Sequence, residues 1–304
     1  MGGLHMNSET INGTASINGV ELYFEVTGPR TGHPLLLIMG LGAQLTGWPI
    51  DFVNLLCAHG FRPIRFDNRD SGLSTKTAGD PPNALELLSK ALNNEPVESP
   101  YSLSDMADDA TGLLNYLGYD SAHIAGASMG GMIAQTLAIN YPESALSLTS
   151  ISSATGDPLQ FTPTEGALNA IIGTPQTTRN DIISANVLGS KALAGPLWDE
   201  DYAYEQAGNN YDRCFCPDGV SFQMGAIAMS GDRTLQLEKL SLPTLVVHGA
   251  VDPLLPLHCG TATTEAIHGS KLLIFDEMGH DLPSIYWPKL VDGMKELTRK
   301  ENDA

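Results

Sequence analysis

The chain has 304 residues, of which 35 are Asp or Glu and 16 are Lys or Arg, so its formal net charge is −19. A chain of this length can bury a large core, and its 42% content of aliphatic, aromatic and Cys residues excludes intrinsic disorder. The excess of anionic side chains excludes a nucleic-acid partner, which needs clustered Lys and Arg, and it disfavours binding to anionic membranes.

The cysteines and the N-terminal sequence indicate the redox state of the thiols and the cell compartment. Cys57, Cys214, Cys216 and Cys259 are too few for a disulfide framework and lack the spacing of a zinc site, so we expect reduced thiols and no metal. The N-terminus lacks the basic and apolar regions of a secretory signal, which predicts a cytoplasmic protein with a flexible tail at residues 1–13.

In chain order, alternating apolar residues at 14–17 and 20–26 around Asn18-Gly19 predict an antiparallel hairpin. Short, continuous apolar runs then predict strands that are covered on both faces. These strands are expected at residues 34–39, 61–66, 123–127, 146–152, 243–248 and 271–275. Periodicity and capping signals predict helices at residues 50–59, 84–92, 102–118, 129–140, 258–267 and 282–299.

Strands that alternate with helices indicate an α/β fold, with a mostly parallel sheet, helices on both faces and an antiparallel edge. The alternation breaks at residues 155–232, which read as an inserted helical cap. Residues 14–154 and 233–304 then form the core. Residues 121–142 carry no charged side chain, but polar residues and central glycines favour a strand turning into a buried helix over a membrane span.

A serine flanked by glycines marks the turn between the strand at 123–127 and the following helix. The segment reads Gly126-Ala127-Ser128-Met129-Gly130. A turn this tight leaves no room for flanking side chains, whereas the serine is held out above the sheet. The motif alone also fits a plain glycine-rich turn, but its place between a strand and a helix favours Ser128 as a nucleophile.

A serine nucleophile needs a base and an orienting carboxylate, which should follow strands at the same sheet edge. Asp252 and His280 each follow a predicted strand and are expected to fill these roles. Asp157, which follows the strand before the cap, is the alternative acid. His248 lies at the same edge but too near Asp252 in the chain, and it is interpreted as structural.

An oxyanion hole needs two backbone N–H groups aimed at the developing charge, whatever their side chains. Met129, directly after the nucleophile, is expected to supply one. Leu41, in the Gly40-Leu41-Gly42 turn, is expected to supply the other, although these glycines also fit a simple tight turn. Arg69 lies at the same edge and is expected to tie loops together through carboxylates.

With these motifs the chain resembles the α/β-hydrolase superfamily over about residues 14–297. The matching motifs, in the family's order, are Gly40-Leu41-Gly42, Asp67-x-Arg69-x-x-Gly72-x-Ser74, Gly126-x-Ser128-x-Gly130, His248-Gly-x-x-Asp252 and Gly279-His280. Residues 38–49 and 68–70 resemble a subgroup of bacterial carboxylesterases that includes aclacinomycin methylesterase. One departure is Met39, where many relatives have His, but the expected donor is backbone.

The resemblance implies a carboxylic ester hydrolase that needs no metal or organic cofactor. Ser128 would attack the ester carbonyl, His280 would carry the proton, and Asp252 would orient the imidazole through an acyl-enzyme intermediate. A compact cap predicts preference for small to medium apolar esters. The expected pocket residues are Trp48, Trp198, Phe222 and Met224.

Other functions are compatible with the same residues. The same triad serves carbon–carbon hydrolases, perhydrolases, thioesterases, lactonases and acyltransferases, and a few relatives are non-catalytic ligand receptors. We expect a small-molecule ester as the partner, no membrane or nucleic acid, and a monomer or homodimer. Few Lys and Arg, together with 31 Gly, predict a mesophilic or cold-active enzyme.

Overall fold

The computed structural model describes residues 10–93, 95–173 and 176–299. One eight-stranded sheet has the order β1-β2-β4-β3-β5-β6-β7-β8. β2 pairs antiparallel with β1 and β4, and every other neighbouring pair is parallel. The strands are β1 (Thr10–Ile17), β2 (Val20–Thr27), β3 (His33–Ile38), β4 (Phe61–Phe66), β5 (Ala122–Ala127), β6 (Ala145–Ile151), β7 (Thr244–Gly249) and β8 (Lys271–Phe275).

Eleven α-helices accompany the sheet in the described residues. They are α1 (Ile50–Ala58), α2 (Ala84–Leu92), α3 (Leu103–Tyr116), α4 (Met129–Asn140), α5 (Glu165–Ile172), α6 (Arg179–Leu193), α7 (Glu200–Arg213), α8 (Pro217–Ser230), α9 (Thr234–Leu237), α10 (Leu257–Ala266) and α11 (Trp287–Arg299). This arrangement confirms the predicted α/β-hydrolase fold, with a mostly parallel sheet and helices on both faces.

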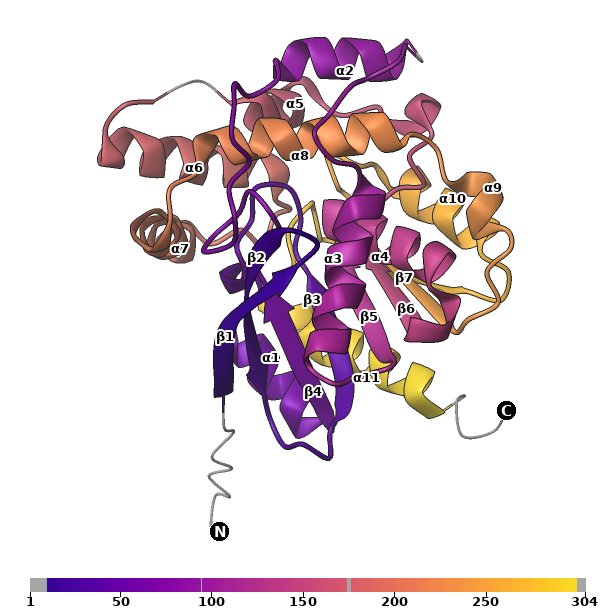
Figure 1. The fold of residues 1–304 in the computed structure, drawn as a ribbon. Helices are drawn as coiled ribbons and strands as arrows, with labels where there is room; N and C mark the ends of the chain where they lie inside the picture. The colour runs from indigo at the N-terminus through magenta and orange to yellow at the C-terminus, as the bar shows by residue number, and fades with distance from the viewer. Residues whose placement is uncertain (1–9, 94, 174–175, 300–304) are drawn as a thin grey trace.

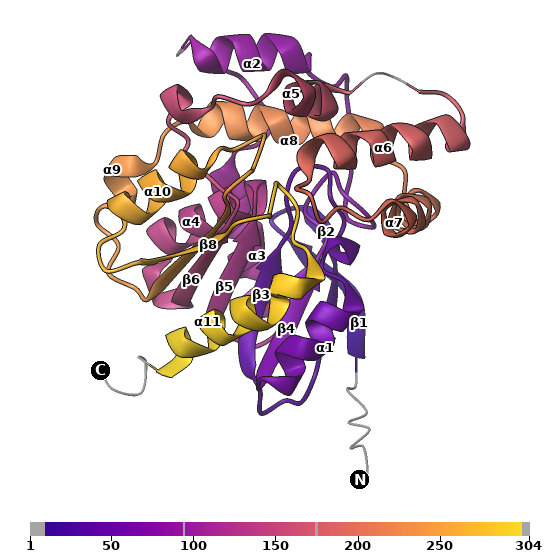
Figure 2. The ribbon, with the colours of Figure 1, turned by 180° about the vertical axis from the view of Figure 1, so that it is seen from behind.

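The sheet separates two apolar cores. Helices α3, α4 and α10 cover one face, and α1 and α11 cover the other (Figures 1 and 2). Strand β3 shows how one apolar run serves both, because Leu36 and Ile38 join the first core while Leu35 and Leu37 join the second. Side chains of a strand alternate between faces, so a strand covered twice must be apolar throughout.

The charge-free stretch folds as predicted into a strand and a helix, β5 and α4, and nearly all of α4 is buried. In the described ranges, no helix has both the length and the apolar character needed to cross a bilayer.

The segment between β6 and β7 carries α5 to α8, which lie together above the sheet (Figure 1). The short helix α2, predicted within the core segment, lies over α8 and joins this layer.

Near the N-terminus, β1 begins at Thr10 rather than at the predicted Thr14. Residues 10–13, predicted to be tail, pair with β2 because their alternation continues the hairpin. The rest of the predicted tail, residues 1–9, lies outside the described residues.

Candidate active site

The turn between β5 and α4 forces Ser128 into an unusual conformation. Its φ of 54° and ψ of −121° are strained for a residue with a side chain, and such strain is typical of functional sites. A Cβ on Gly126 would overlap the carbonyl oxygen of Gly130, and one on Gly130 would overlap the carbonyl oxygen of Ile38. The flanking glycines therefore let the turn close against the neighbouring strand while the Ser128 side chain projects from it.

The structure brings Ser128, His280 and Asp252 together although they are far apart in the chain. Ser128 Oγ lies 2.9 Å from His280 Nε2, and His280 Nδ1 lies 2.8 Å from Asp252 Oδ2. With Nδ1–H donating to the carboxylate, Nε2 is the imidazole atom left to accept the serine hydroxyl proton. These contacts form one hydrogen-bonded path from hydroxyl to carboxylate.

The Asp252 carboxylate is buried and fixed from its other side. Its Oδ1 accepts the backbone N–H groups of Leu254 and Leu255, each at 2.9 Å. His248 Nε2 lies 3.7 Å from Oδ2 and 2.7 Å from the Leu255 carbonyl, and burial lowers the pKa of His248. Asp157, the alternative acid, instead accepts from Leu159 N–H at 2.9 Å at the start of a short helical turn.

The turn that contains Leu41 lies against the serine. A Cβ on Gly40 would stand 3.7 Å from Ser128 Oγ. Within the described residues, neither Leu41 N–H nor Met129 N–H donates to a protein acceptor, so both donors are available to a ligand. The Met39 carbonyl accepts from Asn68 Nδ2 at 2.9 Å, which fixes the turn from behind.

The four predicted pocket residues lie on different elements of the chain. Trp48 is buried in the core beneath α1, where it stacks on Phe52 at 5.7 Å between ring centroids. Trp198 donates to Ser190 Oγ at 3.1 Å and lines a surface hollow of about 460 Å³ beside Val251. A substrate pocket that includes these two Trp residues stays a prediction.

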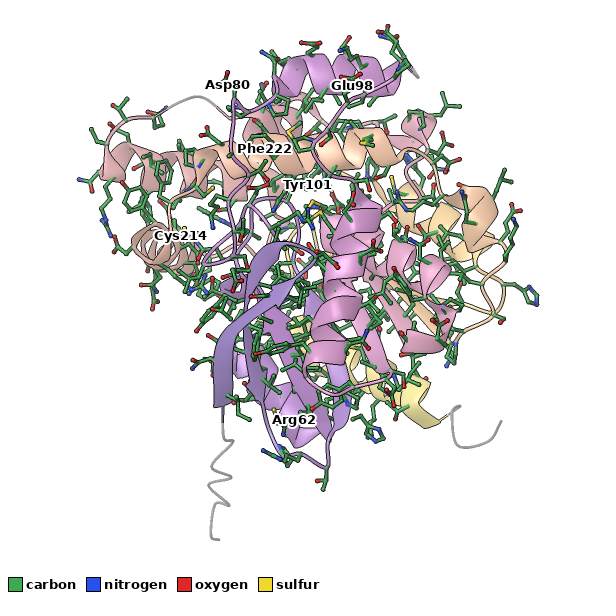
Figure 3. All side chains as sticks on the ribbon, viewed as in Figure 1. Arg62, Asp80, Glu98, Tyr101, Cys214 and Phe222 are labelled. Atoms are coloured by element: carbon green, nitrogen blue, oxygen red, sulfur yellow. The ribbon has the colours of Figure 1, made fainter. Side chains whose placement is uncertain are left out.

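The other two predicted pocket residues lie on α8. Phe222 is buried and belongs to the same core as Tyr101, and Figure 3 shows both residues between α8 and the start of α3. Met224 is partly buried on the same helix. Helix α8 thus contributes both to the cap and to the core beneath it.

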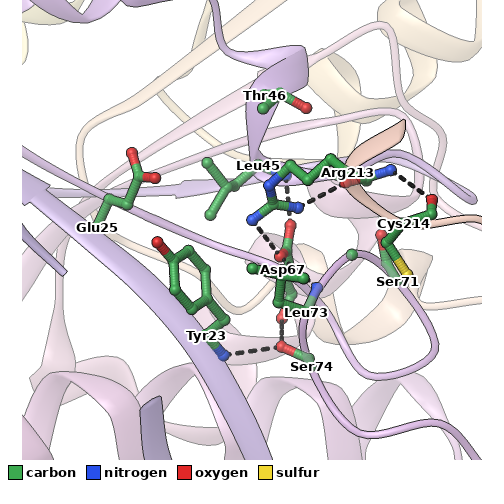
Figure 4. A network of polar contacts seen from close by, with 12 residues as sticks. Tyr23, Glu25, Leu45, Thr46, Asp67, Ser71, Leu73, Ser74, Arg213 and Cys214 are labelled. Carbon is green, nitrogen blue, oxygen red and sulfur yellow. Dashed lines mark hydrogen bonds and ion pairs between the residues drawn. The ribbon is translucent and has the colours of Figure 1, made fainter. Parts of the chain in front are cut away.

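An ion pair that the sequence did not reveal joins the cap to the core (Figure 4). Arg213 Nη2, at the end of α7, lies 2.8 Å from Asp67 Oδ2. Asp67 directly follows β4, and its side chain is fully buried. Asp67 also accepts the backbone N–H groups of Leu45 at 2.7 Å and Leu73 at 2.8 Å. The buried Asp67 carboxylate therefore holds two loops at the sheet edge through hydrogen bonds. Its negative charge is balanced by Arg213 of the cap.

A second contact ties the cap to the histidine loop. His280 N–H donates to the Leu193 carbonyl at 2.7 Å. The neighbouring Asp281 accepts from Gly279 N–H at 2.9 Å and from Gly195 N–H at 3.2 Å, and burial raises the pKa of Asp281. The segment at the end of α6 therefore fixes the backbone around His280. No local sequence motif predicted this contact.

Arg69 pairs with Asp109 through two hydrogen bonds of 2.7 Å. Its guanidinium also lies 4.8 Å from the ring centroid of Tyr101. Arg69 therefore pairs with a carboxylate as predicted, but Asp109 lies on α3, so the pair joins the loop after β4 to a helix and not to another loop.

Comparison with known proteins agrees with this geometry. A family model described as alpha/beta hydrolase fold matches residues 33–283. The chain is 27% identical over 289 residues to rhodomycin D methylesterase from Streptomyces sp. strain C5, a match that covers 87% of this chain and 90% of that protein.

Two further similarities cover nearly the whole chain, one to a curated protein and one to a solved structure. The chain is 27% identical over 283 residues to 2-hydroxy-6-oxononadienedioate/2-hydroxy-6-oxononatrienedioate hydrolase from Burkholderia vietnamiensis, with 86% of each protein covered. A solved thermophilic esterase from Thermogutta terrifontis has a TM-score of 0.72 at 24% identity, over 96% of this chain and 99% of that one. The predicted resemblance to methylesterase-like α/β-hydrolases is confirmed. The chain is a hydrolase and belongs to the α/β-hydrolase fold family.

Proposed function

We propose that this protein is a carboxylic ester hydrolase in which Ser128 is the nucleophile, His280 the general base and Asp252 the orienting acid. The unbroken path of 2.9 Å and 2.8 Å contacts through these side chains supports the proposal most directly. A serine hydroxyl is a weak nucleophile at neutral pH, and a neighbouring imidazole held by a carboxylate activates it.

In the acylation half, Ser128 Oγ attacks the ester carbonyl and its proton passes to His280 Nε2. The oxygen of the tetrahedral intermediate then accepts hydrogen bonds from Leu41 N–H and Met129 N–H. When the carbon–oxygen bond of the ester breaks, the leaving alcohol takes the proton back from His280. The acyl group stays on Ser128.

In the deacylation half, a water molecule takes the place of the alcohol. His280 accepts a proton from the water as its oxygen attacks the acyl-enzyme, and the same two N–H groups stabilise the second intermediate. Collapse releases the acid and returns the proton to Ser128. Asp252 stays ionised and stabilises the imidazolium in both halves.

Three ion-paired arginines favour an uncharged ester over the dicarboxylate named for the Burkholderia relative. A bound carboxylate needs a cation that is free to pair with it. Arg69 pairs with Asp109, Arg213 with Asp67, and Arg179 with Asp212. An acidic substrate would have to break one of these pairs or use another cation, such as Lys191 beside Trp198.

Esters of short to medium acyl length are the expected substrates, because the cap is fixed to the core at both Arg213 and Gly195. A series of p-nitrophenyl esters from C2 to C12 measures this directly. We expect higher kcat/KM for C4 than for C12. Faster turnover of C12 would show that the cap admits long chains and would contradict the size limit.

Replacement of the nucleophile tests the chemistry itself. Ser128→Ala should lower kcat by about 10⁴-fold or more and abolish labelling by an alkyl phosphonate, because the Ser128 hydroxyl is the one hydrogen-bonded to His280 in the described part of the chain. Ser153→Ala is the matched control, since the Ser153 hydroxyl only donates to the Ser128 carbonyl. Undiminished activity in Ser128→Ala would refute the proposal, and a wild-type protein inert to phosphonates would favour a ligand receptor.

A further inference from the structure

A buried glutamine on α8 forms hydrogen bonds with backbone groups of the core. Gln223 has no exposed surface. Its Oε1 accepts from Gly42 N–H at 2.7 Å, and its Nε2 donates to the Arg69 carbonyl at 2.8 Å. Burying a primary amide is unfavourable unless its polar atoms find partners. Both partners of this cap side chain lie in loops at the active-site edge of the sheet.

The first of these partners belongs to the oxyanion turn. Gly42 has a φ of +67°, and its N–H follows directly on Leu41, the residue whose own N–H we assign to the oxyanion hole. A Cβ on Gly42 would lie 2.8 Å from a methyl group of Val220, so α8 packs tightly against this point of the turn.

The turn is thus held at both ends. Asn68 Nδ2 donates to the carbonyl before Gly40, and Gln223 accepts the N–H after Leu41. A hydrogen-bond donor stabilises a transition state only if it is fixed before the reaction, and small displacements reduce the effect steeply. Of these two anchors, one comes from the core and the other from the cap.

We propose that Gln223 is a positioning residue, which fixes the Leu41 N–H of the oxyanion hole from the cap helix α8. The inference rests on the proposed ester hydrolysis and adds that the cap supports catalysis as well as substrate selection. Loss of the Gln223 amide should then weaken stabilisation of the tetrahedral intermediate while leaving ground-state binding of the ester nearly unchanged.

The test compares Gln223→Met with Gln135→Met. Methionine preserves side-chain length without the amide. Gln135 is equally buried and hydrogen-bonded, to Ser150 and Arg233, but does not contact the turn. The readouts are kcat and KM for p-nitrophenyl butyrate, and the rate constant with which a p-nitrophenyl alkylphosphonate labels Ser128.

We expect Gln223→Met to lower kcat and the labelling rate in parallel, by about tenfold to a hundredfold, with KM within about threefold of wild type. Gln135→Met should lower thermal stability but neither rate. Wild-type rates in Gln223→Met, or equal losses in both variants, would overturn the inference.

The labelling rate separates this inference from the proposed function. Wild-type protein that is labelled but hydrolyses no ester would refute the ester hydrolase, while the labelling rates would still decide the role of Gln223. Wild-type protein that is not labelled would refute both.

If Gln223→Met does not fold, Gln223→Glu provides the second measurement, since its shape is nearly unchanged. A protonated Glu can make both hydrogen bonds, whereas an ionised one is repelled by the Arg69 carbonyl. Its kcat relative to wild type should therefore fall as pH rises, and a ratio independent of pH would overturn the inference.

Discussion

At Gly130, the backbone of the nucleophile turn lies directly against the end of β3. A Cβ there would overlap backbone atoms of Ile38, which cannot move without disturbing the sheet. Gly130 is therefore required because it has no side chain. This is a more demanding constraint than core packing between side chains, which can change rotamers to make room.

We predict that Gly130→Ala lowers the free energy of unfolding by about 3 kcal/mol and abolishes most activity, because the turn must shift. Urea denaturation and ester hydrolysis measure the two effects. Gly166→Ala on α5 is the control, since nothing lies within 4 Å of its Cβ position, and stability should be unchanged or slightly higher. A stable, fully active Gly130→Ala would contradict the overlap.

The sequence predicted the residues whose position follows from the ends of strands. Ser128, Asp252 and His280 each follow a recognisable strand, and parallel strands end at one edge, so their meeting could be expected. Trp48 could not be placed in this way. Its short helical turn leads directly into α1, and only the folded core shows that its ring stacks inward on Phe52.

At the scale of elements, helix α7 is joined to the core by hydrogen bonds to Gln44 and Thr46 and by one buried ion pair. Asp67 is fully buried, and Arg213 is the cation that compensates it. Removing one partner of such a pair leaves an unpaired buried charge, which costs far more than the loss of a surface contact. The cap and the sheet edge should therefore lose stability together.

We predict that Arg213→Met destabilises the protein by about 3 to 5 kcal/mol. The matched control is Arg179→Met in the same cap, because Arg179 and Asp212 form an exposed, solvent-screened pair whose loss should cost far less. Thermal and urea unfolding of both variants give the comparison. Equal losses in the two variants would show that burial of Asp67 does not set the energy.

The contacts between elements were the part that sequence patterns could not reveal. Gln223, Asp281 and Arg213 each bind residues more than 80 positions away, and no periodicity or motif relates such positions. The sheet and its helices were predictable because period and capping are local. The cap was predictable only as an interruption, and the addition of α2 to its layer depended on packing against α8.

At the scale of the whole molecule, a buried histidine links stability to pH. His123 on β5 is buried, with its Nδ1 2.8 Å from Ser147 Oγ, and burial lowers the pKa of His123 from 6.5 to about 4. Between pH 6.5 and pH 4, His123 is therefore protonated in the unfolded chain but neutral in the folded chain. The contribution of His123 to stability is complete above pH 6.5 and is lost as pH falls toward 4.

We predict a loss of about 3 kcal/mol from this group between pH 7 and pH 4. His123→Gln should make the free energy of unfolding less dependent on pH over this range than it is in the wild type. Urea denaturation of the variant and the wild type at several pH values measures the difference. An identical pH dependence in His123→Gln and wild type would contradict the assignment.

The insertion of the cap between β6 and β7 also sets the order in which the enzyme is completed during synthesis. The nucleophile turn leaves the ribosome first, then the cap, and only afterwards the segments with Asp252 and His280. Because domains begin to fold as they emerge, the elbow can form on β5 while its base is still untranslated. A chain arrested before residue 252 carries the proposed nucleophile but lacks the proposed acid and base, so on this proposal it would be unable to hydrolyse an ester before the last two strands are made.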